Sequence, residues 1–417
     1  MIMADDRRSL AVFPVGRSPE RRRLGSPIRK AAVLNWVFYR LVGGSRPRAS
    51  APKWKVGIYK YDRLGDFILS IGAIRQIIDI AGEENCVLLH SAYAADAARS
   101  EFPNLARIEL PVLDSRLWNT WRKLRDPSWR ERIGGGVDEL LCLRHFRSPH
   151  DEVALQMIPS RVVWAARHRN AFPHDGELIR RRYEADRIVD RGQSDADRGV
   201  CEDLSCHFGL IASWAGKAIA WTDILPRIDL GPRLRRDEMV ICPIASQAVR
   251  DLPMPAVLSA VRHAREAWGL RPLLLSPPGV AAFEAIREQL LKEGESVEIR
   301  VTHGFSELLE SLAASTLVLT ADTATAHMAA ALDMPMVCLL GGGQYGAFGP
   351  WRRSRRQVWL THHVPCFQCN WLCVQEGPIC ITRVSGEELT SAIDAVLRHP
   401  VPADAAAGES RGPGEPW

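Results

Sequence analysis

Polar side chains that could take part in chemistry stand where two apolar stretches end. Asp66 closes the polar turn 60–66, and Asp322 with Thr323 follows the apolar stretch 316–320. Helical patterns begin after both turns. In open α/β sheets, ligands bind at the turns that follow the carboxyl ends of strands. Both turns are therefore candidate ligand-binding positions, and capping of a helix N-terminus is the alternative role for their side chains.

Four cysteines crowd into a short stretch near the C-terminus, with spacings of two, three and six residues between neighbours. They are Cys366, Cys369, Cys373 and Cys380, among ten cysteines in the chain. Thiolate sulfur suits tetrahedral zinc or iron. The sequence therefore predicts a candidate structural metal site here, and reduced thiols in a packed loop are the alternative. The other cysteines are scattered, and we expect no disulfides among them in a reducing compartment.

The rest of the chain alternates between predicted strands and helices, in two halves. The first helix, 67–81, has Ile71, Ile74 and Ile78 at helical spacing. Such alternation predicts parallel sheets with helices on both faces. The predicted strands are 53–59, 85–90, 106–110, 137–143, 161–165, 239–244, 272–275, 297–301, 316–320 and 335–340.

Proline and charge gather at 226–238, where we place a domain boundary. The predicted parts are a basic N-terminal extension, an N-terminal acceptor-side domain, a C-terminal donor domain that includes the cysteines, and a disordered tail: 1–52, 53–232, 233–399 and 400–417.

Charge is uneven along the chain. The net charge is +5 over 417 residues, but residues 1–50 carry +8 and the remainder carries −3. A basic N-terminal arm can bind anionic lipid or nucleic acid. Alternatively, these residues form a solvated tail with no binding role. Because the body is not basic, we do not expect nucleic-acid binding, and residues 1–50 are the candidate for peripheral membrane contact. No apolar run can span a bilayer and no secretion signal is present, so we expect a cytoplasmic protein.

Three motifs, in order along the chain, give it a resemblance to a known family. They are Arg63-Leu64-Gly65-Asp66, then Asp322 and Thr323 with His327, then Gly349-Pro350-Trp351. On a double βα chain they resemble glycosyltransferase family 9, the ADP-heptose:lipopolysaccharide heptosyltransferases and their relatives, over residues 53–398. The resemblance implies an α/β fold of the GT-B type, with two Rossmann-like domains facing across a cleft. It also implies inverting sugar transfer from a nucleotide-diphosphate donor.

The resemblance assigns roles to the matching residues. The family's acid maps onto Asp66, which would take the proton of the acceptor hydroxyl as general base, in a turn shared with Arg63 and Gly65. The family's donor turn maps onto the segment from Asp322 to His327, whose backbone N–H groups at a helix start would bind the diphosphate.

Thr323 would add a hydrogen bond to the diphosphate. His327 would contact a phosphate or the sugar, with a packed structural histidine as the alternative. The chain departs from the family at Ala324, where glycine is usual, so a methyl group would narrow the approach of the phosphates.

Further donor contacts are expected from two other loops. Arg250 stands where the family has lysine, in the loop that contains Ser246, and a cation there would neutralise the departing diphosphate. A surface charge is the alternative for Arg250. In the glycine-rich loop 341–349, Gly341 and Gly342 are expected to close against the donor.

The sequence as a whole predicts an enzyme that moves a heptose or related sugar, from ADP-heptose by family default, to a lipopolysaccharide core or other cell-surface glycan. No cofactor is expected for catalysis. One alternative is a protein-modifying heptosyltransferase with iron or zinc on its cysteines, and another is a non-catalytic nucleotide-binding scaffold. A dinucleotide-dependent dehydrogenase is disfavoured because no G-x-G-x-x-G follows the first strand.

Overall fold

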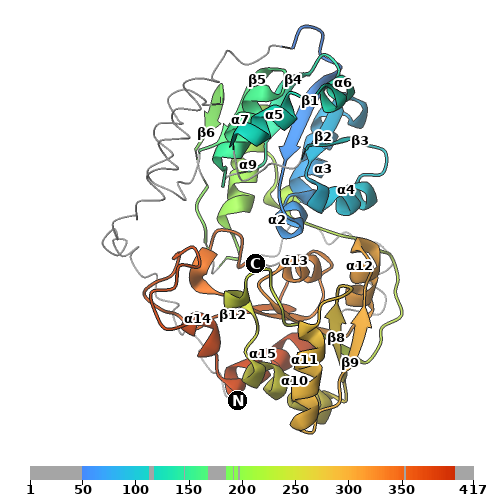
Figure 1. Ribbon diagram of the computed structural model, residues 1–417, viewed down its shortest axis with the longest axis vertical. Coiled ribbons are helices and arrows are strands. Elements are labelled where there is room, and N and C mark those ends of the chain that lie inside the picture. The colour runs from blue at the N-terminus through green and yellow to red at the C-terminus, as the bar shows by residue number, and fades with distance from the viewer. Residues whose placement is uncertain are drawn as a thin grey trace.

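The computed structural model of the chain describes residues 49–111, 117–144, 146–167, 185–190, 192–195, 198–351 and 354–399. Figure 1 shows two α/β domains, one above the other along the long axis, each with its own sheet. Most of the basic N-terminal extension, with the membrane contact predicted for it, and the C-terminal tail lie outside the described residues. Within these ranges no helix is both long and apolar enough to cross a membrane.

The first domain is built on a parallel sheet of six strands in the order β3-β2-β1-β4-β5-β6. Every residue of β2 is buried, as expected for a strand covered on both faces. The strands are β1 (Trp54–Lys60), β2 (Cys86–His90), β3 (Ala106–Glu109), β4 (Val137–Cys142), β5 (Ser160–Ala166) and β6 (Arg187–Val189).

Helices flank this sheet. The α-helices are α2 (Leu64–Leu69), α3 (Ile71–Ala81), α4 (Ala95–Glu101), α5 (Leu117–Leu124), α6 (Pro127–Ile133), α7 (Pro149–Met157) and α9 (Glu202–Ala215). Short 3₁₀ helices are η1 (Glu83–Asn85), η2 (Ala92–Ala94) and η3 (Trp221–Ile224).

The single helix predicted over 67–81 is wrong in two respects. The chain is helical from Leu64, and the helix breaks at Ser70, whose hydroxyl donates to the backbone oxygen of Asp66 over 3.1 Å. Asp66 therefore lies inside the first turn of α2, and the N-cap position belongs to Arg63. The capping alternative for Asp66 is thereby corrected, because its carboxylate makes no hydrogen bond to the helix N-terminus.

The second domain repeats the plan with strand order β12-β11-β10-β7-β8-β9, again all parallel. Its strands are β7 (Glu238–Cys242), β8 (Arg271–Ser276), β9 (Glu298–Val301), β10 (Leu317–Ala321), β11 (Met336–Leu339) and β12 (Gln357–Leu360). Its helices are η4 (Ala248–Arg250), α10 (Met254–Trp268), α11 (Ala282–Lys292), α12 (Phe305–Ala314), α13 (Ala324–Ala331), η5 (Gly342–Gln344), α14 (Ile379–Thr382) and α15 (Gly386–Leu397).

The two domains meet through α2 and α13, and one cluster of buried apolar residues continues across both. Phe67 and Ile68 of α2 belong to it together with Ala326 and Met328 of α13. Backbone hydrogen bonds also join the domains, for example from the Ile228 N–H to the Ala331 oxygen over 3.0 Å. This packing brings the carboxyl-terminal edges of the two sheets toward each other.

Candidate functional site

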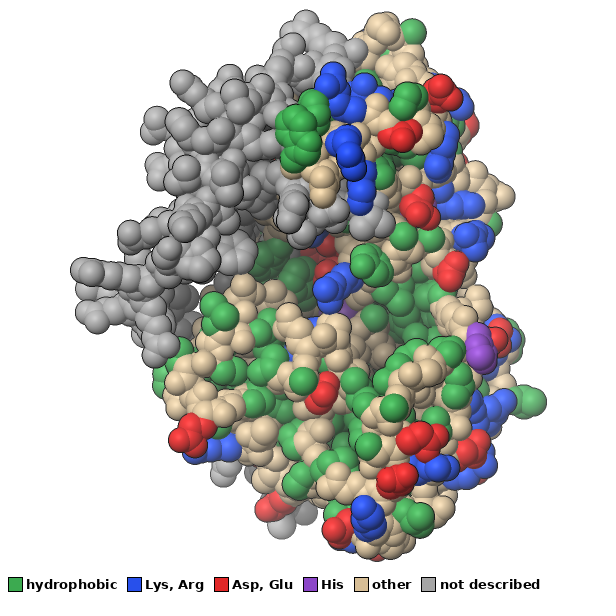
Figure 2. All heavy atoms as spheres, viewed as in Figure 1, with side chains coloured by type: hydrophobic (Ala, Val, Ile, Leu, Met, Phe, Trp, Pro, Cys, Tyr) green, Lys and Arg blue, Asp and Glu red, His purple; other side chains and the backbone are tan. Residues whose placement is uncertain are grey.

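A cleft opens between the two domains at the carboxyl ends of both sheets. Figure 2 shows the surface hollowed there, and the cleft has a volume of about 690 Å³. That size fits a ligand as large as a nucleotide with an attached sugar. Six residues predicted for the site line its walls on both sides: Arg63, Gly65, Asp66, Ser246, Arg250 and Asp322. Thr323, Ala324 and His327 line it as well.

Asp66 faces the cleft from the first domain. Its position follows from the short α2, which begins directly after β1 and carries the carboxylate into the space between the sheets. Among the described residues its carboxylate has no hydrogen-bond or ion-pair partner. The side chain is therefore available to a hydroxyl that enters the cleft.

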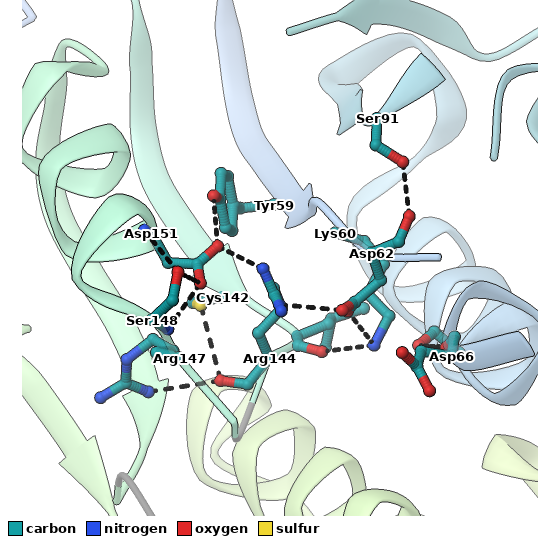
Figure 3. A network of polar contacts seen from close by, with 12 residues as sticks. Tyr59, Lys60, Asp62, Asp66, Ser91, Cys142, Arg144, Arg147, Ser148 and Asp151 are labelled. Carbon is teal, nitrogen blue, oxygen red and sulfur yellow. Dashed lines mark hydrogen bonds and ion pairs between the residues drawn. The ribbon is translucent and has the colours of Figure 1, made fainter. Parts of the chain in front are cut away.

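A buried network of charges lies beside Asp66 (Figure 3). The Lys60 ammonium, 1% exposed, lies 2.8 Å from one oxygen of Asp62 and donates to the Leu143 backbone oxygen over 2.9 Å. The other Asp62 oxygen lies 3.0 Å from Nε of Arg144, which also pairs with Asp151. Each buried charge thus has an opposite partner, as it needs in a low-dielectric environment.

This environment sets the protonation of Asp66. Desolvation in the cleft wall, reinforced by the charge of Asp62, raises the pKa of Asp66 to about 7, while Lys60 opposes the rise. Burial alone would lower the pKa of Lys60, but the neighbouring Asp203 and Asp62 raise it above its ordinary value. Lys60 therefore stays charged. Asp66 changes its charge near neutral pH, which is the range that suits a proton acceptor.

On the opposite wall, Arg250 is held by its own domain. Its guanidinium donates to the backbone oxygen of Asp322 over 3.0 Å and to Oγ of Ser246 over 2.6 Å. The same Ser246 oxygen accepts from Arg63 of the first domain over 3.1 Å. Two cations from different domains therefore converge on one hydroxyl. Desolvation raises the pKa of Asp322 to about 6, and Arg250 opposes that shift.

The turn before α13 forms as the sequence predicts. Thr323 is its N-cap: its side chain accepts from the Thr325 N–H over 3.3 Å, and its backbone oxygen accepts from the Ala326 N–H over 3.1 Å. The first domain approaches this turn closely at Gly65. A Cβ on Gly65 would lie 3.3 Å from the Ala324 Cα and 3.2 Å from Cδ2 of His327. The glycine of the first motif thus permits the contact between the domains.

His327 is held in one protonation state and one orientation. The indole N–H of Trp351 donates to Nδ1 of His327 over 3.0 Å, and Trp351 is fully buried. Because the indole can only donate, Nδ1 must be the acceptor and Nε2 must carry the proton. Burial lowers the pKa of His327 to about 4. At neutral pH this histidine is an uncharged hydrogen-bond donor at the cleft wall.

Gly341 and Gly342 do not reach the cleft as the sequence suggested. A side chain on Gly341 would lie 2.5 Å from the Trp371 ring, and one on Gly342 would lie 2.4 Å from the Phe367 ring. Both glycines are buried under this aromatic cover. The glycines of this loop therefore allow the cysteine-rich segment, rather than a donor, to pack closely against the loop.

The four clustered cysteines line one small cavity, together with Gly342 and Phe367. All ten cysteines of the chain are free. The described residues nevertheless contain no group of three or more His, Cys, Asp or Glu side chains arranged to hold a metal ion. As they stand, the thiols do not fit the metal predicted from their spacing, and the packed-loop alternative describes their arrangement.

Several cleft residues were not singled out from the sequence. Arg144, Phe146 and Asp203 line the first-domain side, and Gln344, Phe348, Asn370 and Trp371 line the second. Arg144 follows β4 at the same sheet edge as Asp66, so its place after a predicted strand was a usable signal. No comparable signal marks Trp371, because its position depends on how the cysteine-rich segment folds back.

Three comparisons with known proteins bear on this site. Residues 213–373 match the model of glycosyltransferase family 9 (heptosyltransferase). A stretch of 156 residues is 27% identical to lipopolysaccharide heptosyltransferase 1 of Pseudomonas aeruginosa; the match covers 34% of this chain and only 42% of that relative.

Solved structures extend the similarity of fold to both domains. E. coli heptosyltransferase WaaC with ADP matches with a TM-score of 0.59 at 14% identity, over 82% of this chain and 99% of that one. A family 9 glycosyl transferase from Veillonella parvula matches with a TM-score of 0.60 at 12% identity, over 84% of this chain and 99% of that one.

Two Rossmann-like domains around this cleft define a GT-B protein, and the predicted fold class is confirmed. Residues 213–373, which contain the second and third motifs, are similar to glycosyltransferase family 9. The predicted resemblance to that family is thereby confirmed.

The contact between Trp351 and His327 yields a first prediction. In ¹⁵N-histidine spectra at neutral pH, we expect the His327 ring to be protonated on Nε2 alone. Replacement of Trp351 by Phe removes the only donor to Nδ1 among the described residues, so both neutral tautomers should become populated.

Trp359→Phe is the matched control. The Trp359 ring also lies beside His327, 6.0 Å between ring centroids, but its buried N–H has no acceptor in the described chain. This variant should leave the tautomer unchanged. An unchanged His327 spectrum in Trp351→Phe would contradict the assignment.

Proposed function

We propose that the protein is an inverting glycosyltransferase that moves a heptose or related sugar from a nucleotide-diphosphate donor to a glycan acceptor. The observation that carries the proposal is the opposition of two walls across one cleft. A carboxylate without a partner, Asp66, faces a cation, Arg250, and the N-terminus of α13. Sugar transfer needs a base for the acceptor and positive charge for the leaving group, on opposite sides of the reacting carbon.

On the acceptor side, Asp66 is proposed as the general base. A pKa of about 7 leaves this carboxyl a substantial ionised fraction at neutral pH, yet makes it more basic than an ordinary aspartate. Attack from the side opposite the departing diphosphate would invert the configuration at the sugar carbon. Lys60 is the buried counter-charge that favours the ionised form of Asp66 before the proton arrives.

On the donor side, the diphosphate is proposed to lie at the start of α13. The helix dipole favours an anion at this N-terminus. Arg250 and Thr323 would add hydrogen bonds, and the uncharged Nε2–H of His327 would add a donor. Ala324, the first residue of α13, would place only a methyl group beside the phosphates. These protein groups can meet the charge of the leaving group, so we propose that no cofactor takes part in the chemistry.

We further propose ADP-heptose as the donor and a lipopolysaccharide core, or another cell-surface glycan, as the acceptor. The named activity of the P. aeruginosa relative supports this assignment. A cytoplasmic location fits the unpaired cysteines, since reducing compartments keep thiols free. Membrane contact through residues 1–50 remains a proposal that rests on their positive charge.

The predicted structural zinc or iron remains a proposal for the four-cysteine cavity. All four cysteines border one space, and four thiolates are a ligand set typical of a tetrahedral structural site. The metal would hold this loop together and take no part in sugar transfer.

Asp66→Asn tests the base. Transfer should fall by about 10²–10⁴-fold, the usual contribution of a general base, while binding of ADP stays within a few-fold of wild type. In the wild type, kcat/KM should rise as pH increases through about 7 and then level off, because the raised pKa keeps Asp66 protonated below that point. Asp79→Asn, an exposed acid on α3, is the control. Full activity in Asp66→Asn, or a profile without this limb, would refute the assignment.

Calorimetry with ADP, UDP and GDP tests the donor site. ADP should bind best, and Arg250→Ala should weaken it by about 10- to 100-fold, because a charge-assisted hydrogen bond to phosphate is lost. Arg262→Ala, which removes a surface arginine of α10 that pairs with Glu295, should bind as wild type does. A preference for UDP or GDP would overturn the heptose donor and keep the fold. No binding of any nucleotide would favour the scaffold alternative.

Elemental analysis of protein purified without chelators tests the metal. We expect about one zinc or iron per chain, and its loss together with a lower unfolding midpoint in Cys366→Ser/Cys369→Ser. Metal-free protein that unfolds at the same temperature with and without a chelator would count against the proposal.

A further inference from the structure

The cysteine segment, defined here as residues 361–380, follows β12 and ends in the first turn of α14, and it forms part of the cleft wall. It is tied to the loop after β11 by backbone hydrogen bonds from Gln368 to the Gly342 oxygen over 2.7 Å and from Asn370 to the Gly343 oxygen over 2.8 Å. The family motifs and the predicted site assign no function to this wall.

The backbone of the segment adopts conformations that side chains seldom take. Gln368, Asn370 and Trp371 have φ angles of 65°, 51° and 64°, in the left-handed region. Such residues persist only where surrounding contacts impose them, and they often occur at ligand sites. Here the imposed conformation places the Trp371 ring over Gly341 and Gly343, where any side chain would clash with it.

From that position Trp371 lies beside the residues that are proposed to bind the diphosphate. The Arg250 guanidinium carbon lies 5.4 Å from the centre of the Trp371 ring, and both residues line the cleft. Two amides line the same cleft, and Nε2 of Gln344 donates to Oδ1 of Asn370, the residue before Trp371, over 3.1 Å. This pair retains amide N–H groups of Asn370 and the Gln344 carbonyl for a ligand.

The strand order shows which part of a donor these residues would meet. Leu275, Phe283 and Leu308 line the cleft at the β8 and β9 end of the sheet, where an apolar wall suits a nucleobase. Arg250 and the α13 turn lie in the middle, at β7 and β10. Trp371 lies beyond them, over the loop after β11. In an extended nucleotide-diphosphate sugar, the sugar lies on the side of the diphosphate opposite the base.

We propose that Trp371, with Asn370 and Gln344, forms the subsite for the transferred sugar. The proposal rests on the proposed function, because it assumes a nucleotide-sugar donor. The face of an indole accepts the C–H groups of a sugar ring, and the two amides match sugar hydroxyls, which both donate and accept. The cysteine segment would thus position the Trp371 ring for contact with the sugar.

Trp371→Ala tests the subsite through the difference between two ligands. Calorimetry with ADP and with ADP-heptose separates the sugar from the rest of the donor. We expect ADP-heptose to bind about 5- to 10-fold more weakly to this variant, with ADP changed by less than about twofold. Trp371→Phe, which keeps a ring, should lose less. Leu372→Ala is the control, since its neighbouring side chain is 74% exposed.

Retained ADP binding also shows that each variant is folded. An equal loss for both ligands would mean that Trp371 acts only through Arg250, and no loss for either would exclude contact; both results overturn the proposal. Should wild type prefer UDP or GDP, the same comparison is made with UDP-glucose or GDP-mannose. If the wild type binds no nucleotide sugar, the proposed function is refuted together with the subsite. If the wild type binds the donor but Trp371→Ala shows no selective loss, only the subsite is refuted.

Discussion

The close packing of α2 on α13 is the contact on which the site depends. It joins the two domains through one continuous apolar cluster and is tight at Gly65, where a Cβ would lie 3.2 Å from Cδ2 of His327. Because Asp66 lies on α2 and the turn proposed to bind phosphate begins α13, the same contact fixes the distance between the proposed base and the proposed leaving-group site. Groups separated by more than two hundred residues are thereby held in one cleft.

Electrostatics divides this cleft into two halves with different tasks. On the first domain, buried Lys60, Asp62 and Arg144 compensate one another and leave Asp66 as the acid that titrates near neutrality. On the second, Arg250 and the start of α13 present positive charge, while the Trp351 hydrogen bond keeps His327 neutral.

The cysteine segment joins two features that look unrelated in sequence. The glycines of the loop after β11 resemble a phosphate-binding turn, but they are covered by Trp371 and Phe367. The thiols resemble a metal knuckle, yet in the described chain they only border a cavity. The covered glycines and the clustered thiols both fit a cysteine segment whose structural role is to position the Trp371 ring beside Arg250.

The amino-acid sequence by itself determined the alternation of strands and helices, the two-domain plan and the turn that carries Asp322 and Thr323, because these follow from local patterns of apolar and polar residues. It did not yield the break at Ser70 or the short strands β6 and β12, whose signals are weak over three or four residues. Only the tertiary structure decided the Trp351–His327 hydrogen bond, the charge network around Asp66 and the place of Trp371. Each depends on residues far apart in the chain that meet only when the elements pack.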